Sequence, residues 1–379
     1  MPISIAIVGT RGIPASYGGF ETFAQELCLR LAERGHDVTV YCRSHHTPRQ
    51  LRRFGGVRLV VLPTLRHKYF DTVAHTLVSS LHALGSRHDV VLLCNAINSC
   101  FIPVLKLSGA RVAINVDGLE WQRKKWNLLG KGLYRVSEKI ACLAADAIVT
   151  DSTTIQSYYR RAHQTRTVFI PYGAPTEKVE PNGTLARFGL DPGKYILYVS
   201  RFEPENNAHL VLEAFQRVRT ESKLVMVGDA PYAKPYISKL KEMAGPRVLF
   251  TGYLFGRDYR ELMSHAYCYV HATEVGGTHP ALIEGMGLGN GVIVSDTPQN
   301  REVAGDAALF FSLDGPGHLS EQLQLALARP ELLQELSDRA RRRVETRYNW
   351  DRVTDDYENL LVSLRKDPVL RISPSRSRT

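Results

Sequence analysis

Residues 271–311, HATEVGGTHPALIEGMGLGNGVIVSDTPQNREVAGDAALFF, contain the pattern that decides the fold of this chain. The segment begins at the end of an apolar strand and continues into a Gly-Gly-Thr-His-Pro loop. Pro280 suits the first turn of a helix, because its missing N–H would have no partner at that position. The pattern therefore predicts a short helix over residues 281–287 and a strand over residues 291–295.

The loop before this helix is suited to an anion. The N–H groups of Gly276, Gly277 and Thr278 lie at the helix N-terminus, where the helix dipole favours negative charge. Glu284 follows one turn into the helix, on the face that points back towards a bound anion. A glycine loop alone is a weak signal. The loop, the helix start, the carboxylate and the following strand together predict a nucleotide or sugar-phosphate site.

This segment resembles the donor-sugar loop of retaining family-4 glycosyltransferases, which have the GT-B fold. That family usually has two glutamates separated by seven residues, and the second contacts the nucleotide ribose. Glu284 matches the second, whereas the first falls at Gly276, and the nearest acid is Glu274. The resemblance implies that Glu284 and loop residues 276–279, His279 included, bind the donor. It also makes Glu274 a candidate catalytic acid.

The amino end carries a second resemblance. The runs IVGTRGIP (residues 7–14) and YGGFET (residues 17–22) are similar to those of a subgroup that contains bacterial rhamnosyltransferases. The similarity extends over nearly the whole chain, from residue 3 to about residue 362. It implies transfer of L-rhamnose from dTDP-β-L-rhamnose to a glycan acceptor, lipid-linked as in the synthesis of bacterial cell-surface polysaccharides. It further implies retention and no cofactor besides the donor.

Composition indicates a globular chain. Hydrophobic residues make up 44% and charged residues 23% of the sequence, and 379 residues suit two domains of average size. No apolar run approaches the ~20 residues needed to span a bilayer. The start, MPISIAI, has no charged segment before its apolar run, so we expect a first β-strand rather than a signal peptide. The six cysteines form no C-x-x-C pair, which predicts reduced, buried thiols rather than a zinc site or disulfides.

The net charge of +10 is unevenly distributed. Residues 1–175 contain 22 Lys and Arg against 11 Asp and Glu, whereas residues 176–379 contain 26 against 27. A basic half beside a neutral half indicates that the first half faces an anionic partner. An anionic membrane surface or a lipid-linked pyrophosphate fits, and so does nucleic acid, although no nucleic-acid-binding signature is present. The membrane alternative predicts a cytoplasmic protein held peripherally at the inner face of the plasma membrane.

The first domain opens with a strand, a glycine-rich loop over residues 9–19, a helix over residues 20–34 and a second strand, as doubly wound α/β domains do. A dinucleotide-binding domain would have G-x-G-x-x-G and an acid at the end of the second strand. Here the loop begins G-x-x-G and the strand runs into Cys-Arg-Ser. Two alternatives remain. Gly18 and Gly19 bring backbone N–H groups to a donor diphosphate, or they form a tight turn without a ligand.

A later strand, over residues 111–116, ends at Asp117 and Glu120, where open α/β sheets place ligands. These are the only acids between Asp89 and Glu138. The residues alone support a catalytic Asp117 and a turn-forming Asp117 equally. The resemblance implies catalysis, because in the related transferases this strand end reaches the reacting sugar.

The next segment, WQRKKWNLLGK (residues 121–131), alternates tryptophans with cations and leads into an apolar and basic helix. One interpretation is an interfacial membrane contact through Arg123, Lys124 and Lys125. The other is a solvated basic face with packed tryptophans.

The second domain follows residues 174–192, which contain three prolines and two glycines and are predicted to be a linker. Its first strand, over residues 195–200, runs into Arg201, a cation suited to binding a diphosphate bidentately. The alternative for Arg201 is a surface ion pair with Glu203 or Glu205.

The resemblance implies further donor-binding residues in this domain. The family usually pairs the arginine with a lysine a few residues later, and that position is Asn206 here. Gly252 and Tyr253 follow a strand whose end lies near the base in the family. His279 is a candidate contact to the sugar or the phosphate, or a residue that only shapes its loop.

We therefore expect an α/β protein of the GT-B fold, with two facing Rossmann-like domains and a cleft between them. The predicted organisation is an acceptor-side domain over residues 1–173, the linker over 174–192, a nucleotide-sugar donor domain over 193–350, a helix over 351–365 that packs back on the first domain, and a disordered basic tail over 366–379.

The predicted chemistry is glycosyl transfer without metal. No D-x-D pair, P-loop or H-E-x-x-H motif occurs, so a leaving diphosphate would be stabilised by helix N-termini and cations. The alternative enzymes are a UDP-hexose-dependent transferase and an epimerase on the same fold. A non-catalytic nucleotide- or nucleic-acid-binding protein is the alternative of another class, because it would explain the basic half without catalysis.

Overall fold

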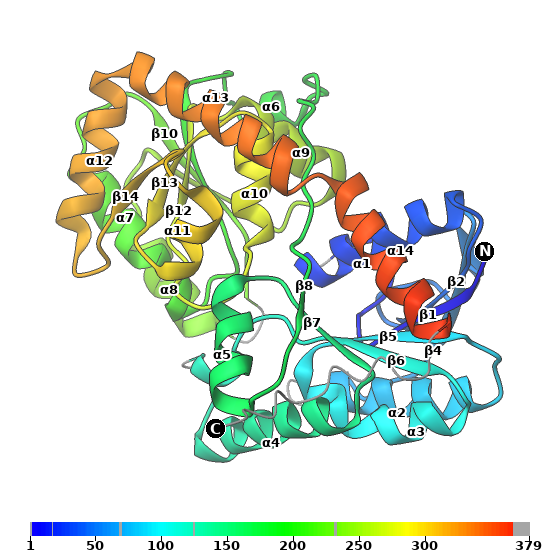
Figure 1. The fold of residues 1–379 in the computed structure, drawn as a ribbon. Helices are drawn as coiled ribbons and strands as arrows, with labels where there is room; N and C mark the ends of the chain where they lie inside the picture. Colours follow the sequence, from blue (N-terminus) through cyan, green and yellow to red (C-terminus); the bar gives the residue numbers. More distant parts are fainter. Residues whose placement is uncertain (1, 17, 68–69, 124–125, 231–232, 367–379) are drawn as a thin grey trace. The chain divides into compact units, whose positions relative to one another are not determined.

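The computed structural model describes residues 2–16, 18–67, 70–123, 126–230 and 233–366. It separates into two compact units, one formed by Met1–Tyr172 with Trp350–Thr379 and the other by Gly173–Asn349. Each unit is built on its own, mainly parallel sheet (Figure 1). The predicted α/β class with two Rossmann-like domains is confirmed.

The sheet of the first unit has the strand order β3-β4-β2-β1-β5-β6-β7-β8. The β3–β4 pair is antiparallel, and the other pairs are parallel. Its strands are β1 (Ser4–Val8), β2 (Asp37–Arg43), β3 (Arg53–Phe54), β4 (Val57–Leu62), β5 (Val90–Cys94), β6 (Arg111–Asn115), β7 (Ala147–Thr150) and β8 (Val168–Phe169). The central strands are continuous apolar runs because helices cover both of their faces.

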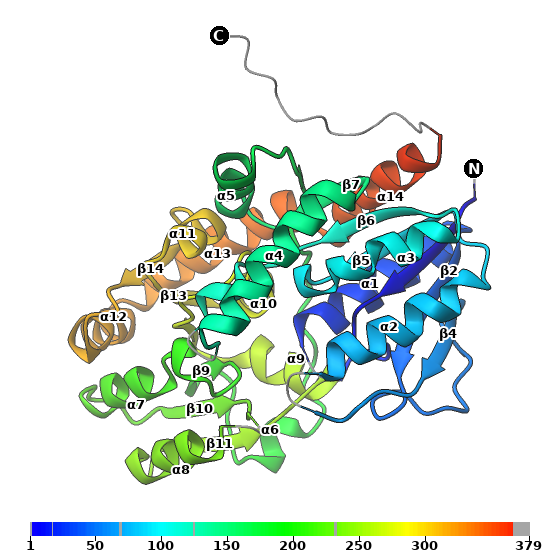
Figure 2. The ribbon, with the colours of Figure 1, turned by 90° about the horizontal axis from the view of Figure 1, so that it is seen from below.

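Helices α1 and α14 cover one face of this sheet, and α2, α3, α4 and α5 lie against the other (Figures 1 and 2). Their bounds are α1 (Gly19–Glu33), α2 (Asp71–Leu84), α3 (Ile102–Leu107), α4 (Leu128–Ala144), α5 (Thr153–His163) and α14 (Trp350–Lys366). Along β1, Ala6 and Val8 belong to the apolar core that also contains residues of α2 to α5. Local caps set two helix starts: the Asn127 side chain accepts from the N–H of Gly130 at α4, and Ser152 caps α5 in the same way.

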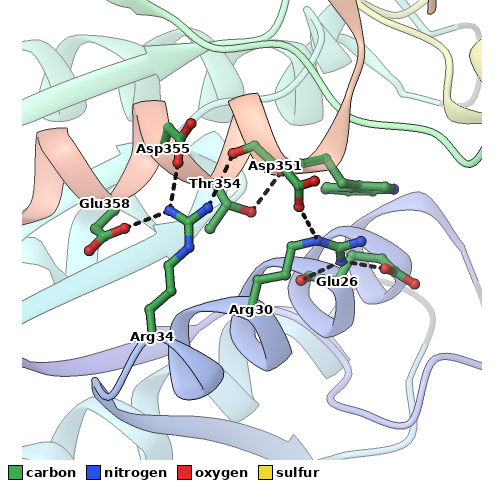
Figure 3. Close-up of polar contacts among 8 residues, drawn as sticks. Glu26, Arg30, Arg34, Asp351, Thr354, Asp355 and Glu358 are labelled. Carbon is green, nitrogen blue, oxygen red and sulfur yellow. Dashed lines mark hydrogen bonds and ion pairs between the residues drawn. The ribbon is translucent and has the colours of Figure 1, made fainter. Parts of the chain in front are cut away.

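The last helix is fastened to the first by ion pairs and aromatic contacts. Arg34 Nη1 lies 2.7 Å from Asp355 Oδ1 and 2.6 Å from Glu358 Oε2 (Figure 3). Beside them, the rings of Phe23 and Tyr357 have centroids 5.2 Å apart. The end of the described chain is thereby part of the first unit.

The sheet of the second unit has six parallel strands in the order β11-β10-β9-β12-β13-β14. They are β9 (Tyr195–Val199), β10 (Lys223–Val227), β11 (Val248–Gly252), β12 (Cys268–His271), β13 (Gly291–Ser295) and β14 (Ala308–Phe311). Because all six run the same way, the loops after them meet at one edge of the sheet, which is where open α/β sheets bind ligands.

The helices of this unit are α6 (Thr184–Arg187), α7 (Ala208–Gln216), α8 (Lys234–Met243), α9 (Gly256–His265), α10 (Pro280–Gly287), α11 (Pro298–Ala304), α12 (Pro316–Ala328) and α13 (Pro330–Arg347). Five of them have proline in their first two positions, as predicted for α10. Cys268 and Val270 of β12 face the core formed with α7, α8 and α12. Tyr269 faces α10 instead, where a Cβ on Gly285 would lie 2.7 Å from its ring.

Two segments contain structure that the sequence analysis did not indicate. Before α3, the 3-10 helix η1 (Ala96–Phe101) is capped by the side chain of Asn95. The segment predicted to be a linker contains the short helix α6, and Ala174 forms a bridge with Asn349. Tyr17, Lys124, Lys125 and residues 367–379, which enter the sequence predictions, lie outside the described residues.

All six cysteines are free thiols, four of them buried. Within the described ranges, no helix is both long enough and apolar enough to cross a bilayer.

Candidate active site

The glycine loop of the first unit ends at the amino end of α1. Gly18 is the N-cap residue and Gly19 is the first residue of the helix. Glu21, in the first turn, is buried, and its Oε1 accepts a hydrogen bond from the N–H of Arg11 at 3.0 Å. Burial raises the pKa of Glu21, although Arg11 opposes the shift. The predicted diphosphate-binding N–H groups therefore lie beside a buried carboxyl group.

Asp117 follows β6 with a left-handed backbone, φ 57°. Its N–H donates to Asn115 Oδ1 at 3.0 Å, and its Oδ1 accepts from the hydroxyl of Tyr172 at 3.2 Å. Burial raises the pKa of Asp117 and the charge of Glu120 raises it further, whereas Arg123 and the Tyr172 hydroxyl lower it. Asp117 therefore both forms the turn after β6 and has a carboxyl group with a raised pKa. Tyr172, 55 residues away, has no local sequence signal.

Glu120 and Arg123 form a buried ion pair, with Glu120 Oε1 2.5 Å from Arg123 Nε and each residue 9% exposed. Glu120 belongs to η2 (Glu120–Gln122), so the two side chains meet across one short helical turn. Arg123 is therefore not one of the exposed cations that the membrane interpretation of this segment invokes, because its charge is directed inward to this carboxylate.

The two tryptophans of this segment are packed within the unit. The guanidinium of Arg135 lies 4.4 Å from the centroid of the Trp121 ring. The ring of Trp126 lies 5.2 Å from that of Tyr134. Of the two sequence interpretations, packed tryptophans describe these rings.

In the second unit, the neighbouring strands β9 and β12 bring the Arg201 loop beside the donor loop. Arg201 Nη2 lies 3.9 Å from Glu203 Oε2, a long ion pair, and the Arg201 side chain is 34% exposed. Asn206 is buried, and its Nδ2 donates to the carbonyl oxygen of Arg201 at 2.6 Å. Asn206 therefore supports the loop that presents the arginine.

Glu274 is held at the start of the donor loop by Asn207, which sequence analysis missed. Asn207 has φ 57°, and its Nδ2 donates to the carbonyl oxygen of Ala272 at 2.9 Å and to Glu274 Oε1 at 3.0 Å. The N–H of Glu274 donates to the carbonyl oxygen of Glu205 at 3.1 Å. The Asn-Asn pair was an available signal, since asparagine tolerates left-handed backbone better than most residues.

The imidazole of His279 occupies the space beside Gly276. A Cβ at Gly276 would lie 2.3 Å from His279 Cε1, so a glutamate could not stand there without displacing the ring. Behind it, the ring of His271 lies 4.8 Å away, and Tyr269 Oη is 3.0 Å from His271 Nδ1. Burial lowers the pKa of His271, and a charge on His279 lowers it further, so His271 is neutral at neutral pH. An imidazole therefore stands where the resembling family usually has a carboxylate.

Glu284 lies in α10, and its Oε2 accepts a hydrogen bond of 2.6 Å from the hydroxyl of Tyr259 in α9. Burial raises the pKa of Tyr259 and the charge of Glu284 raises it further, so the phenol stays protonated and remains a donor. Tyr259 thus fixes the orientation of the carboxylate predicted to contact the ribose. Its distance of 25 residues in sequence hides it from local motifs.

An aromatic pair follows β11. Gly252 has φ 71°, and the rings of Tyr253 and Phe255 then stack with centroids 5.6 Å apart and planes at 22°. Phe255 is 38% exposed. Such a surface suits stacking with a nucleobase. Phe255 extends the predicted Gly252–Tyr253 site.

No group of three or more His, Cys, Asp or Glu in the described part of the chain is arranged to hold a metal ion.

Two family models match separate parts of the chain. Residues 3–175 match a domain of unknown function, DUF1972, and residues 187–343 match glycosyl transferases group 1. The chain is 24% identical to spore coat protein SA of Bacillus subtilis over 395 residues, covering 95% of this chain and 98% of the relative. It is 28% identical to the alpha-1,3/1,6-mannosyltransferase ALG2 of Eremothecium gossypii over 279 residues, covering 63% of this chain and 52% of ALG2.

Solved structures share the fold over 95% of the chain. Sucrose-phosphate synthase from Thermosynechococcus elongatus aligns with a TM-score of 0.80 at 20% identity, covering 95% of this chain and 98% of that one. Anabaena Alr3699/HepE in complex with UDP-glucose aligns with a TM-score of 0.79 at 14% identity, covering 95% and 100%. The GT-B fold is therefore shown. With the group 1 domain, it supports a glycosyltransferase that uses a nucleotide-sugar donor.

Proposed function

We propose that this GT-B glycosyltransferase moves L-rhamnose from dTDP-β-L-rhamnose to a lipid-linked glycan, with retention and without a metal ion. The observation that carries the choice of sugar is the imidazole of His279 in the space beside Gly276. A carboxylate there would accept hydrogen bonds from sugar hydroxyls. An imidazole has apolar C–H edges, and each of its two ring nitrogens can make one hydrogen bond. That surface suits a 6-deoxy sugar, in which a methyl group replaces one hydroxyl.

The diphosphate is assigned to Arg201 and to the N–H groups of Gly276, Gly277 and Thr278 at the start of α10. As the bond from the sugar to the diphosphate breaks, negative charge grows on the leaving oxygen. A fixed guanidinium and helix-start N–H groups stabilise that charge without having to reorganise. They supply the positive potential that a divalent cation supplies elsewhere.

The nucleoside is assigned to the same unit. The Tyr253–Phe255 pair would stack on the thymine ring, and Glu284, oriented by Tyr259, would accept a hydrogen bond from the deoxyribose hydroxyl. Deoxythymidine can make both contacts, because it has a pyrimidine ring to stack and a deoxyribose hydroxyl to donate.

The acceptor is assigned to the first unit, in which Asp117 is the acidic side chain that would contact it. A carboxyl group whose pKa is raised by burial accepts a proton more readily near neutral pH than an ordinary aspartate does. Glu120 holds Arg123 beside it, which limits how far the pKa of Asp117 rises. Glu274, two positions before Gly276 in the sequence, is the candidate acid of the second unit.

The test is a panel of nucleotide sugars, each incubated with the protein with and without EDTA, and product analysis by NMR for the anomeric configuration. We expect turnover of dTDP-L-rhamnose, unchanged by EDTA, with the donor configuration kept in the product. Preferential turnover of UDP-glucose, the ligand of Alr3699/HepE, would establish the UDP-hexose alternative. A changed sugar without transfer would indicate an epimerase. Binding without turnover of any donor would indicate a non-catalytic protein.

A further inference from the structure

One helix of the first unit presents an apolar face to solvent. We call this the α4 face, and its side chains are Leu128, Leu129, Leu133, Val136 and Leu143, exposed by 89%, 72%, 54%, 54% and 87%. Leu129, Leu133, Val136 and Leu143 follow one another at intervals of four, three and seven residues, so they form one stripe along the helix.

The buried face of α4 is more polar than its exposed face. The residues that α4 buries are Tyr134, Ser137, Glu138 and Ala141. A surface helix normally turns its apolar stripe to the core. Here the small and polar residues face inward, and the large aliphatic residues face outward. Core packing therefore does not explain the stripe.

The charge at the α4 face is entirely positive. Lys131, Arg135 and Lys139 flank one side of the stripe. The one acid of α4, Glu138, is buried and accepts hydrogen bonds from Tyr158 at 2.9 Å and, when its ring nitrogen is protonated, from His163 at 3.3 Å. An aliphatic stripe with a cationic border and no exposed acid is complementary to an anionic lipid surface.

The α4 face belongs to a larger apolar side of the same unit. Helices α2, α3 and α4 lie on one side of the sheet (Figure 2). Their outward positions add exposed Leu77, Leu81, Leu84 and Leu107. Of the thirteen large hydrophobic side chains that are exposed in the described residues, nine lie on these three helices. Such concentration on one side marks a docking surface rather than scattered exposure.

A hollow of about 430 Å³ adjoins the stripe, lined by Trp121, Gln122, Leu128, Lys131, Gly132 and Arg135. Two cations, a tryptophan and an amide around one hollow suit the phosphate and polar groups of a lipid headgroup.

We propose that α4 lies in the interface of an anionic bilayer, with the α4 face inserted among the acyl chains and Lys131, Arg135 and Lys139 at the phosphates. A second copy of this chain is a poorer occupant, because two identical faces would bring like charges together. The inference deepens the proposed function and rests on it in one respect, that a lipid-linked acceptor gives membrane docking its purpose.

The experiment is co-sedimentation with vesicles of pure phosphatidylcholine and of phosphatidylcholine with phosphatidylglycerol, over a salt series. We expect the wild type to prefer the anionic vesicles and to release as salt rises. The variant Leu129→Glu/Leu133→Glu/Val136→Glu should lower the partition coefficient roughly tenfold or more. Each change removes an aliphatic side chain that would insert among the acyl chains and adds a negative charge that the anionic lipids repel. Leu65→Glu, which alters an equally exposed leucine outside α4, is the matched control and should bind as the wild type does.

A second variant separates charge from insertion. Lys131→Gln/Lys139→Gln should lower binding to anionic vesicles by roughly fivefold per cation removed and leave binding to neutral vesicles unchanged. Transfer to a soluble acceptor should be unchanged in every variant, so a failed transferase assay and a failed docking assay are distinct results. The proposal is overturned if the wild type does not prefer anionic vesicles, or if the triple-Glu variant binds them as the wild type does. It is also overturned if light scattering shows a dimer for the wild type and a monomer for the triple-Glu variant.

Discussion

Gly276→Ala tests whether the imidazole of His279 takes the place of the missing carboxylate. The added methyl group would lie 2.3 Å from His279 Cε1, whereas ordinary contacts begin at 3.4 Å. The ring must therefore move by about 1 Å or turn away. The backbone does not resist the change, because Gly276 is not in the left-handed region. The cost falls on the position of the imidazole more than on folding.

The expected effect is on the sugar portion of the donor. Losing a hydrogen bond and a ring contact to the sugar costs about 1–2 kcal/mol, which corresponds to a roughly 5–30-fold weaker donor affinity. Affinity for dTDP alone should change little, since dTDP lacks the rhamnose that would contact this loop position. Titration calorimetry with dTDP-L-rhamnose and with dTDP measures the two separately. Gly317→Ala is the control, because a Cβ there meets nothing within 4 Å.

A double variant tells displacement from damage to the loop. If the imidazole is the sugar contact, His279→Ala should weaken donor binding as much as Gly276→Ala, and the two changes together should cost no more than either alone. Equal losses for dTDP and dTDP-L-rhamnose would mean that the methyl group disturbs the diphosphate loop instead. Donor affinity within twofold of the wild type in Gly276→Ala would refute the reasoning.

Three further predictions follow from named contacts. Arg201→Ala should weaken binding of a nucleoside diphosphate by about 1.5–3 kcal/mol, the range for a hydrogen bond to a charged group, and unchanged calorimetric affinity would contradict it. Tyr172→Phe removes a hydrogen bond to ionised Asp117, so its pKa rises and the acid limb of the kcat/KM profile should move to higher pH; an unmoved limb excludes Asp117 as the titrating group. Burial alone would raise the pKa of Glu358, but hydrogen bonds from Arg34 and a histidine lower it below its usual 4.5. Ionised Glu358 therefore stabilises the folded protein above about pH 4.5, and this stabilisation is lost as the pH falls through the lower pKa of the folded state. Glu358→Gln should cost roughly 0.5–1 kcal/mol of unfolding free energy at neutral pH and nothing in acid, measured by urea unfolding through the three tryptophans, all in the first unit; a cost that persists in acid would contradict the ion-pair explanation.

The fold could be predicted because its signals are local. Parallel strands buried on both faces are continuous apolar runs, and glycine or proline marks the helix starts beside them. The segment around Pro280 is an example, since each of its elements depends on residues within about ten positions. The family resemblance predicts the donor loop from signals that are local in the same way.

The partners of the site residues could not be predicted, because they come from distant positions. Asp117 meets Tyr172, and Glu284 meets Tyr259, across gaps of 55 and 25 residues. Arg123 shows a second limit. A basic run in sequence indicates surface charge on average, but a nearby carboxylate can turn one member inward.

Helix α4 shows a third limit, and it connects the two proposals made for the first unit. Periodicity tells which residues share a face of a helix, but not which face meets the core. Its outward side has the aliphatic stripe, while Arg135 on its flank stacks on Trp121, the residue after Glu120. Trp121 is four positions from Asp117 in the same loop. If α4 lies in the bilayer interface, the acidic group assigned to the acceptor is held within one short loop of the lipid headgroups. A lipid-linked glycan that is still short would present its sugar at that height, which a long, soluble glycan would not require. We therefore predict that the acceptor is a short lipid-linked glycan. Transfer rates should fall as the lipid-linked glycan is lengthened.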